Sequence, residues 1–289
     1  MIGYYHSKDF DGYCSGAIMK RKFPNGTFIG YDYNEPFEIT KSELIMMSDV
    51  SLSMDKMYDI AKACDFNFIW IDHHASAIKD YNIWLESIGM TNNPPYRTVL
   101  QGSGIAACEL TWNYLFSNEK MPLAVKLLGE YDTWRKADLE RWDNEILPFQ
   151  FGMRQIANSL ETFPMNLLES NNEQEVYKII ERGKIVLEYQ AKLNETQCKR
   201  AFEFKFEGYN AICLNTSIFN SDTFNSVYDH EKHDIMIPFQ WDGNTWTISL
   251  YSKKDSINCS IIAKSKGGGG HPKAAGFKVQ DIRTIFPFL

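Results

Sequence analysis

The sequence predicts an α/β protein with two domains, the first built around a mostly parallel sheet. Up to about residue 135, short apolar runs alternate with segments of helical spacing. Continuous apolar runs separated by helices are typical of parallel strands that are covered on both faces. Beyond a long helical stretch the pattern changes to strands with a hairpin signal, which predicts a smaller second α/β domain with a mixed sheet.

Each element of the first domain follows from its own pattern. The expected strands cover residues 2–5, 27–31, 44–47, 66–71 and 97–100. Helical spacing lies between them, at Cys14, Ala17 and Ile18 and again at Met54, Met57, Ile60 and Ala61. Residues 136–170 are predicted to add helices to this domain. We therefore expect a domain at 1–170, a connecting helix at 171–203 and a second domain at 204–289.

The second domain is expected to contain strands at 209–214, 235–241, 245–251 and 277–279. Asp242-Gly243-Asn244 lies between the second and third of these and favours a hairpin turn. A helical segment at 259–264 then leads into four consecutive glycines.

Composition limits the classes of function. The chain has 289 residues, 44% of them hydrophobic and 14% aromatic, enough for real cores. A net charge of −7 argues against a surface that grips long nucleic acid, so no duplex-binding face is expected. No apolar run is long enough to span a membrane and no signal peptide is expected, which favours the cytoplasm. The six scattered cysteines never form a C-x-x-C pair and are interpreted as small buried hydrophobes.

Acids and histidines follow three of the predicted strands. His6, Asp9 and Asp11 come after the first, Asp49 after the third, and Asp72, His73 and His74 after the fourth. Ligands of parallel sheets bind beyond the carboxyl ends of the strands, so these side chains are expected to converge. Carboxylates with imidazoles suit hard or borderline divalent cations. Asp49 has an alternative interpretation as a helix N-cap, a role that Ser51 or Ser53 could fill instead.

Two further motifs complete the set. Asp132 ends an apolar helical pattern within Glu130-Tyr-Asp-Thr-Trp134. The second is Gly267 to Gly270 followed by His271 and Lys273, where bare backbone N–H groups can bind a phosphate or a base. Apolar residues flank this loop on both sides, which argues against a flexible linker.

Taken in order, these motifs resemble those of the DHH phosphoesterase superfamily, in the branch with a C-terminal DHH-associated domain. RecJ-type exonucleases and the smaller oligoribonucleases (nanoRNases) belong to that branch, and the short chain is more similar to the second group. The resemblance implies an active site in the cleft between the domains. It also implies two Mn²⁺ ions, with Mg²⁺ or Co²⁺ as possible replacements.

The resemblance assigns roles to individual residues. One ion would be held by His6, Asp9 and Asp49, and the other by Asp11, Asp49, His73 and Asp132. Asp49 would bridge the ions, His74 would contact the scissile phosphate, and Asp72 would orient the histidines. The substrate-binding set would be His74, Ser252, Gly268, Gly269, Gly270, His271 and Lys273. Tyr251 stands where relatives often carry a phosphate-gripping arginine, so recognition of the phosphate end is left open.

The sequence thus predicts a two-metal phosphodiesterase or exonuclease that acts on short single-stranded oligonucleotides or linear dinucleotides. Alternatives are a 3′-phosphoadenosine 5′-phosphate phosphatase, a cyclic-dinucleotide phosphodiesterase and a catalytically silent nucleotide-binding protein. A manganese pyrophosphatase uses similar metal motifs, but its usual second domain lacks the glycine-rich histidine loop. RNA or DNA preference, polarity, substrate length and a possible homodimer are left open.

Overall fold

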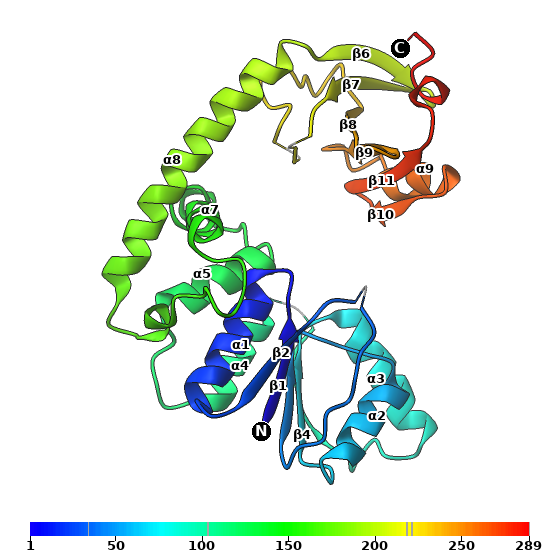
Figure 1. Cartoon of the computed structure of the whole chain (residues 1–289). Coiled ribbons are helices and arrows are strands. Elements are labelled where there is room, and N and C mark those ends of the chain that lie inside the picture. The colour runs from blue at the N-terminus through cyan, green and yellow to red at the C-terminus, as the bar shows by residue number, and fades with distance from the viewer. Residues whose placement is uncertain (34, 103, 218, 221, 289) are drawn as a thin grey trace. The chain divides into compact units, whose positions relative to one another are not determined.

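The computed structural model describes residues 1–33, 35–102, 104–217, 219–220 and 222–288 (Figure 1). The chain forms two compact units, residues 1–187 and 188–289. In these described ranges, no helix is both long enough and apolar enough to cross a bilayer. All six cysteines are buried and free, as the sequence predicts.

The first unit contains a five-stranded, fully parallel sheet, which confirms the predicted fold class. Its strands are β1 (Ile2–His6), β2 (Thr27–Tyr31), β3 (Ile45–Ser48), β4 (Phe68–Asp72) and β5 (Arg97–Leu100). All five lie where the apolar runs predict them, with ends that differ by two residues at most. Their order across the sheet is β2-β1-β3-β4-β5.

Helices cover both faces of this sheet (Figure 1). One face packs against α1 (Phe10–Lys22), α4 (Ala107–Leu115) and α5 (Leu123–Asp132), and the other against α2 (Met54–Ala63) and α3 (Ala75–Ser87). Adjacent strand residues enter opposite cores: Tyr5 and Ile71 lie in the first core, Tyr4 and Trp70 in the second. Both sides of β1, β3 and β4 are therefore buried, which explains their continuous apolar runs in the sequence.

The strand order defines a switch point between β1 and β3. The chain leaves β1 toward β2 on one side, whereas β3 leads to β4 on the other side. Ligands of open α/β sheets bind beyond the carboxyl ends at such a point, where the loops diverge. His6 ends β1 and Asp49 follows β3, so two of the predicted ligands lie at this position.

Further helices extend the first unit, as predicted for residues 136–170. They are α6 (Leu139–Arg141), η1 (Trp142–Ile146), α7 (Leu147–Ile156) and η2 (Met165–Leu168). The long helix α8 (Glu173–Cys198) runs from the first unit into the second. The predicted connecting segment also included Phe202 and Glu203, but these residues already lie in a strand.

The second unit is a mixed six-stranded sheet with the order β10-β11-β9-β8-β7-β6. Its strands are β6 (Phe202–Phe206), β7 (Tyr209–Asn215), β8 (Ile235–Trp241), β9 (Trp246–Tyr251), β10 (Gly269–His271) and β11 (Ala274–Val279). The helices are α9 (Cys259–Ser265) and the short η3 (Ile282–Thr284). The hairpin predicted at Asp242-Gly243-Asn244 joins β8 to β9, and Gly243 has a φ of 96°.

Two glycines set the distance between α7 and α8. A Cβ on Gly183 would lie 1.7 Å from the carbonyl oxygen of Pro148, and a Cβ on Gly152 would lie 2.2 Å from that of Ile179. No side chain fits at either position without moving a backbone. Close approach of the two helices therefore requires glycine at both positions.

Replacing Gly183 by alanine is expected to destabilise the first unit by roughly 1–3 kcal/mol, the usual cost of overpacking. In a helix without such a neighbour, the same change would stabilise the helix by about 1 kcal/mol. The sign of the change in the free energy of unfolding therefore shows whether α7 packs this closely on α8. Urea unfolding followed by circular dichroism measures the effect. Lys184→Ala, at the exposed neighbouring position, should stay within about 0.5 kcal/mol of the parent. A more stable Gly183→Ala variant would contradict the packing described here.

Candidate metal centre

Asp49 lies at the centre of the cluster of acids and histidines. It follows β3 with a φ of 60°, in the left-handed region that aspartate enters more readily than most residues. Its backbone N–H donates to the carbonyl of Ile71 at 3.1 Å, which fixes this turn against β4. The residue is only 2% exposed, and its Oδ2 has no hydrogen-bond partner. The N-cap interpretation is excluded because Ser53 precedes α2.

The first ligand set combines His6, Asp9 and Asp49, which offer ligand atoms within 4.8 Å of one another. His6 Nδ1 lies 2.7 Å from Asp9 Oδ2 and 3.8 Å from Asp49 Oδ2. Asp9 also caps α1, because its Oδ1 accepts the backbone N–H of Gly12 at 2.9 Å. A Cβ on Gly12 would lie 1.9 Å from the carbonyl oxygen of His6, so glycine is needed where α1 begins this close to β1.

The second set surrounds His73. Its Nε2 lies 3.4 Å from Asp11 Oδ2, 3.6 Å from Asp49 Oδ1 and 3.4 Å from Asp132 Oδ2. Two ligand atoms that bind one cation at about 2.1 Å and at right angles are about 3 Å apart, so these separations are close to those of a coordination shell. The two oxygens of Asp49 thus face different sets. The structure brings together all six residues that the sequence proposes as metal ligands.

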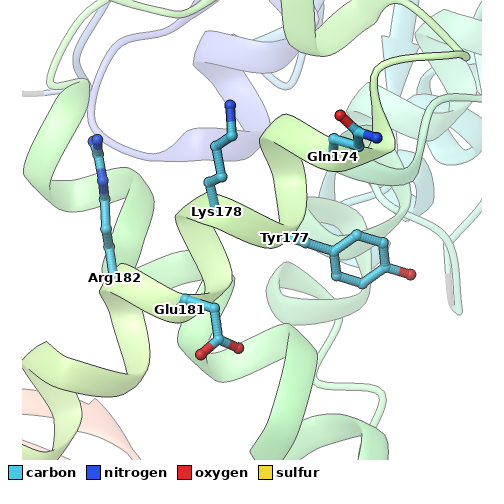
Figure 2. A pocket seen from close by; sticks show the side chains of 5 residues that line it. All are labelled: Gln174, Tyr177, Lys178, Glu181 and Arg182. Atoms are coloured by element: carbon cyan, nitrogen blue, oxygen red, sulfur yellow. The ribbon is translucent and has the colours of Figure 1, made fainter.

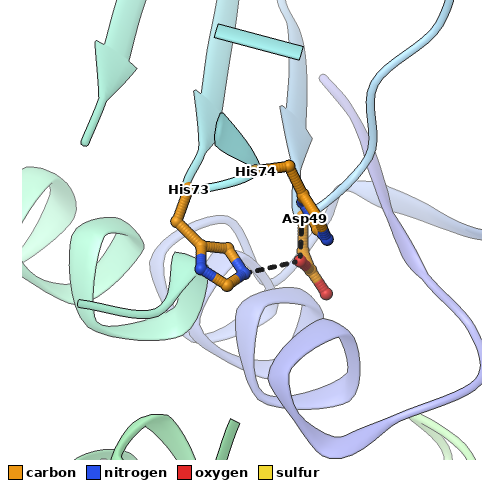
Figure 3. A group of neighbouring side chains, drawn as sticks. All are labelled: Asp49, His73 and His74. Atoms are coloured by element: carbon orange, nitrogen blue, oxygen red, sulfur yellow. Dashed lines mark ion pairs between the residues drawn. The ribbon is translucent and has the colours of Figure 1, made fainter. Parts of the chain in front are cut away.

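Asp72 fixes the turn that carries both histidines. This fully buried carboxylate accepts the backbone N–H groups of His73 and His74 at 2.7 and 3.0 Å through its Oδ1. The same oxygen lies 2.7 Å from His74 Nδ1. Figure 3 shows His73 and His74 beside Asp49, with dashed lines that join Asp49 Oδ1 to His73 Nε2 and to His74 Nδ1. The side chain of His74 is the more exposed of the two, at 46% against 14% for His73.

Helix α4 holds Asp11 in place. The backbone N–H groups of Ala107 and Cys108 donate to the two oxygens of Asp11, at 3.0 and 2.6 Å. Glu109 supports this helix start by accepting the N–H of Ala106 at 3.0 Å. Arg135 donates to the same Glu109 oxygen at 2.5 Å. The start of α4 is therefore tied to the segment that follows Asp132.

The end of α5 positions Asp132. Trp134 has a φ of 54°, in the left-handed region. Its backbone N–H donates to the carbonyl of Tyr131 at 3.1 Å, and the backbone N–H of Arg135 donates to the carbonyl of Glu130 at 2.9 Å. These are the two hydrogen bonds of a Schellman motif, in which the left-handed residue is usually glycine. Asp132 is therefore the last helical residue of a sharply ended helix.

The carboxylates of the cluster oppose one another electrostatically. Burial, followed by the charge of Asp11, raises the pKa of Asp49 well above its usual value. Burial likewise raises the pKa of Asp11, and burial with Asp11 and Asp9 raises that of Asp132 to about 7. Asp9 differs: burial raises its pKa, but the hydrogen bonds from His6 and Gly12 outweigh burial and the pKa is lowered.

These observations fit bound divalent cations. Asp49 is buried, repelled by neighbouring carboxylates and left with an unpartnered oxygen, a costly arrangement unless a cation compensates it. A cation reverses the local effect on pKa and keeps carboxylates charged. Oxygen and imidazole ligands together suit Mn²⁺ or Mg²⁺ better than soft metals. The residues present therefore form a coherent candidate site for metal.

In the second unit, the predicted glycine loop is a β hairpin of β10 and β11. A Cβ on Gly268 would lie 2.1 Å from the carbonyl oxygen of Gly276, and Gly270 has a φ of 135°, so the hairpin itself requires these glycines. His271 is exposed. Lys273 Nζ donates to the carbonyl of Lys254 at 2.7 Å and to Asp255 at 2.8 Å.

Ser252 is 4% exposed, and its hydroxyl donates to the carbonyl of Asp234 at 2.8 Å. This hydroxyl supports the turn after Tyr251, the last residue of β9. Ser252 and Lys273 are therefore both engaged within the second unit. His271, by contrast, has an exposed side chain that forms no hydrogen bond or ion pair with the described residues. Binding roles for Gly268, Gly269, Gly270 and Lys273 stay predictions, as does a site between the units.

Three residues near the centre were not anticipated from the sequence. Glu109 and Arg135 connect α4 to the end of α5, and Tyr33 places its ring 5.7 Å from that of His6. Glu109 is the third residue of a helical pattern, where a capping box has its glutamate, but Ala106 lacks the hydroxyl that completes the box, so the sequence carries only half of that signal. Tyr33 and Arg135 carry no comparable signal, because their partners are distant in sequence.

Comparisons with known proteins place the fold. No protein-family model matches the chain. One curated relative, the uncharacterized protein R106 of Acanthamoeba polyphaga mimivirus, is 27% identical over 262 residues. The match covers 86% of this chain and 56% of the relative, so the chain spans little more than half of that protein.

Solved structures are similar over nearly the whole chain. A pGpG-specific phosphodiesterase, PggH from Vibrio cholerae, has a TM-score of 0.56 at 13% identity, over 98% of this chain and 94% of that one. The DHH domain of PF0399, described as a member of a family of ribosomal proteins, has a TM-score of 0.55 at 13% identity, over 98% and 83%. RecJ of Thermus thermophilus in complex with Mn²⁺ has a TM-score of 0.52 at 14% identity, over 99% and 50%. The chain therefore has the DHH-domain fold.

The raised pKa of Asp132 predicts how stability depends on pH in the metal-free protein. Between pH 4 and 7 the folded state keeps a proton that the unfolded state has released, so stability falls as pH rises through this window. Asparagine stays neutral. Asp132→Asn should therefore be more stable than the parent at pH 8, by roughly 1–2 kcal/mol after discounting for solvent screening. At pH 4 the two proteins should be equal.

Thermal unfolding in the presence of a chelator measures this difference. Saturating Mn²⁺ should reverse the order, because the parent keeps the better ligand set and gains more from binding. Equal stability at pH 8 without metal would show that Asp132 does not share the repulsion within the cluster.

Proposed function

We propose that this chain, which has the DHH-domain fold, is a metal-dependent phosphoesterase that hydrolyses short oligonucleotides and linear dinucleotides. One observation carries the proposal: the two oxygens of the buried Asp49 face different ligand sets, on His6 and on His73. A carboxylate in this position can bridge two cations, and two neighbouring cations suit the attacking and leaving oxygens of a phosphodiester. Manganese is the proposed ion, by the fold likeness to RecJ in complex with Mn²⁺.

When bound, the cations would supply Lewis acidity at the phosphate and lower the pKa of a water molecule. The chain's own residues would hold this arrangement. Asp49 joins the two ligand sets, and Asp11 is immobilised by the N–H groups that begin α4. Because these donors are backbone groups, the carboxylate of Asp11 needs no reorganisation when a substrate arrives.

His74 is proposed to contact the scissile phosphate. Its Nδ1 faces Asp72, which leaves Nε2 for a phosphate oxygen. The hydrogen bond to Asp72, which outweighs burial, raises the pKa of His74 and favours the protonated ring. A protonated ring donates from Nε2 and stabilises negative charge on phosphate.

Several observations favour small nucleotide substrates. PggH, named as pGpG-specific, is matched over 94% of its length, whereas RecJ is matched over 50%. The net charge of −7 argues against a broad surface for long nucleic acid. The exposed His271, the last residue of β10 in the glycine-rich hairpin, is proposed to hold the nucleotide end of the substrate.

A panel of purified substrates tests the proposal. Di- to pentanucleotides, 3′-phosphoadenosine 5′-phosphate and cyclic dinucleotides are incubated with Mn²⁺ and then with Mg²⁺, and products are resolved by size. Stepwise release of mononucleotides supports the proposed activity. Release of inorganic phosphate alone, or opening of cyclic dinucleotides alone, would assign one of the alternative phosphoesterase activities. Tight binding without turnover would indicate a silent nucleotide-binding protein.

Asp49→Asn is expected to lower turnover of a linear dinucleotide by roughly a thousandfold or more, because both ligand sets lose a charged member and several kcal/mol of stabilisation. Isothermal titration should show weakened binding of both manganese ions. Asp80→Asn, an exposed acid of α3, is the matched control and should behave like the parent. Loss of only one ion would mean that Asp49 does not bridge.

His271→Ala is expected to raise the KM for a dinucleotide about tenfold, the scale of one charge-assisted hydrogen bond, with manganese content unchanged. Metal analysis of the purified variant separates the two effects. A drop in bound manganese would place His271 in the metal centre instead, and an unchanged KM would remove it from the substrate site.

A further inference from the structure

Tyr33 lies beside the candidate metal centre on the segment that follows β2. Its ring is 5.7 Å from the ring of His6, at an angle of 54°. The residue is 49% exposed, which a ring packed on both faces would not allow. An open aromatic surface therefore adjoins a proposed metal ligand.

Contacts at both ends hold this ring in place. Its hydroxyl accepts the backbone N–H of Ser51 at 3.0 Å, two residues after Asp49. The ring meets the buried Tyr31 edge-on at 5.5 Å, and Tyr31 in turn meets Phe37 at 5.1 Å. Tyr33 is thus held at its hydroxyl by the loop after β3 and at its ring by the end of β2.

Comparison with Tyr177 shows that an exposed tyrosine does not always have the ring contacts and the hydrogen bond that hold Tyr33. It is 48% exposed, on α8 of the same unit, beside a shallow surface depression that Gln174, Lys178, Glu181 and Arg182 also line (Figure 2). Within the described part of the chain it has no ring contact or hydrogen bond. Tyr33 has the same exposure, but its orientation is fixed, and preorganised aromatic surface reduces the entropic cost of binding.

We propose that Tyr33 is a base-stacking residue, which binds the nucleobase next to the scissile phosphate. This inference rests on the proposed function and adds to it a residue that recognises the nucleobase of the substrate. A base is separated from its phosphate by one sugar, so a phosphate at the metal centre brings a base to the neighbouring ring. Every base offers a π face, so stacking selects nucleotides over baseless phosphates without strong preference among bases.

Double-mutant analysis with modified substrates tests this role. The substrates are a 5′-phosphorylated dinucleotide and its two counterparts that lack either the first or the second base. Stacking on one aromatic ring is worth about 1–3 kcal/mol, so loss of the stacked base should lower kcat/KM of the parent roughly 5- to 150-fold. In Tyr33→Leu, the same loss should change kcat/KM less than about threefold. Leucine keeps apolar packing against Tyr31 but has no π face.

Two variants serve as controls. Tyr33→Phe keeps the ring and should keep the preference for the complete dinucleotide, although it loses the bond to Ser51. Tyr177→Leu removes a tyrosine of equal exposure and should behave like the parent. Thermal unfolding and manganese titration establish that each variant is folded and binds metal.

A binding measurement is independent of turnover. In the presence of Mn²⁺, the parent should bind a nucleoside 5′-monophosphate more tightly than ribose 5-phosphate, and Tyr33→Leu should lose this preference. A variant that retains the full preference in both assays would overturn the role of Tyr33. Failure of the parent to hydrolyse any dinucleotide would instead refute the proposed function, while the binding comparison would still report on Tyr33.

Discussion

The buried carboxylate of Asp49 is the constraint on which the site depends. Water cannot solvate it, and neighbouring carboxylates raise its pKa instead of stabilising its charge. Such a group persists because the surrounding structure holds it in place. Its backbone follows β3 and is hydrogen-bonded to β4, and with a φ of 60° its carboxylate lies between His6 and His73. The free energy that folding spends here can be recovered when cations bind, so stability and metal affinity are linked at this residue.

Sheet topology explains why the short segments after β1 and β3 are sufficient to bring His6 and Asp49 together. β1 and β3 are neighbours, and their outgoing connections run to opposite sides. This divergence leaves the carboxyl ends of both strands uncovered by their own loops, so His6 and Asp49 face each other without any insertion. The segment after β2 then passes along the edge of this gap and brings Tyr33 to His6. The proposed ligands His6 and Asp49 and the proposed base-stacking residue Tyr33 thus come together through one strand order.

Sequence reasoning succeeded where burial imposes a simple pattern. The inner strands β1, β3 and β4 of the first sheet are almost fully buried, so their apolar runs are recognisable, and the polar residues that follow them mark the site. The edge strands β2 and β5 are only partly buried. Two strands of the second unit were not predicted, for different reasons. Phe202–Phe206 alternates with charged residues and is half exposed, and Gly269–His271 has almost no side chains to pattern. Arg135 and Tyr33 were missed because their contacts join segments that are distant in the sequence, which no local period reveals.

At the end of α5, Trp134 adopts a left-handed backbone conformation that tryptophan disfavours, and this places the proposed ligand Asp132. A tryptophan at the left-handed position of a Schellman motif costs of order 1–2 kcal/mol relative to glycine. Packing offsets part of that cost: Trp134 meets the buried Trp142 at 4.9 Å, and Lys136 Nζ lies 3.9 Å from the centre of its ring. The motif ends the helix immediately after Asp132 and directs Arg135 to Glu109, which supports the helix start that binds Asp11. Two carboxylates that face the same histidine are therefore positioned by one connected set of contacts, so a change at Trp134 acts on both.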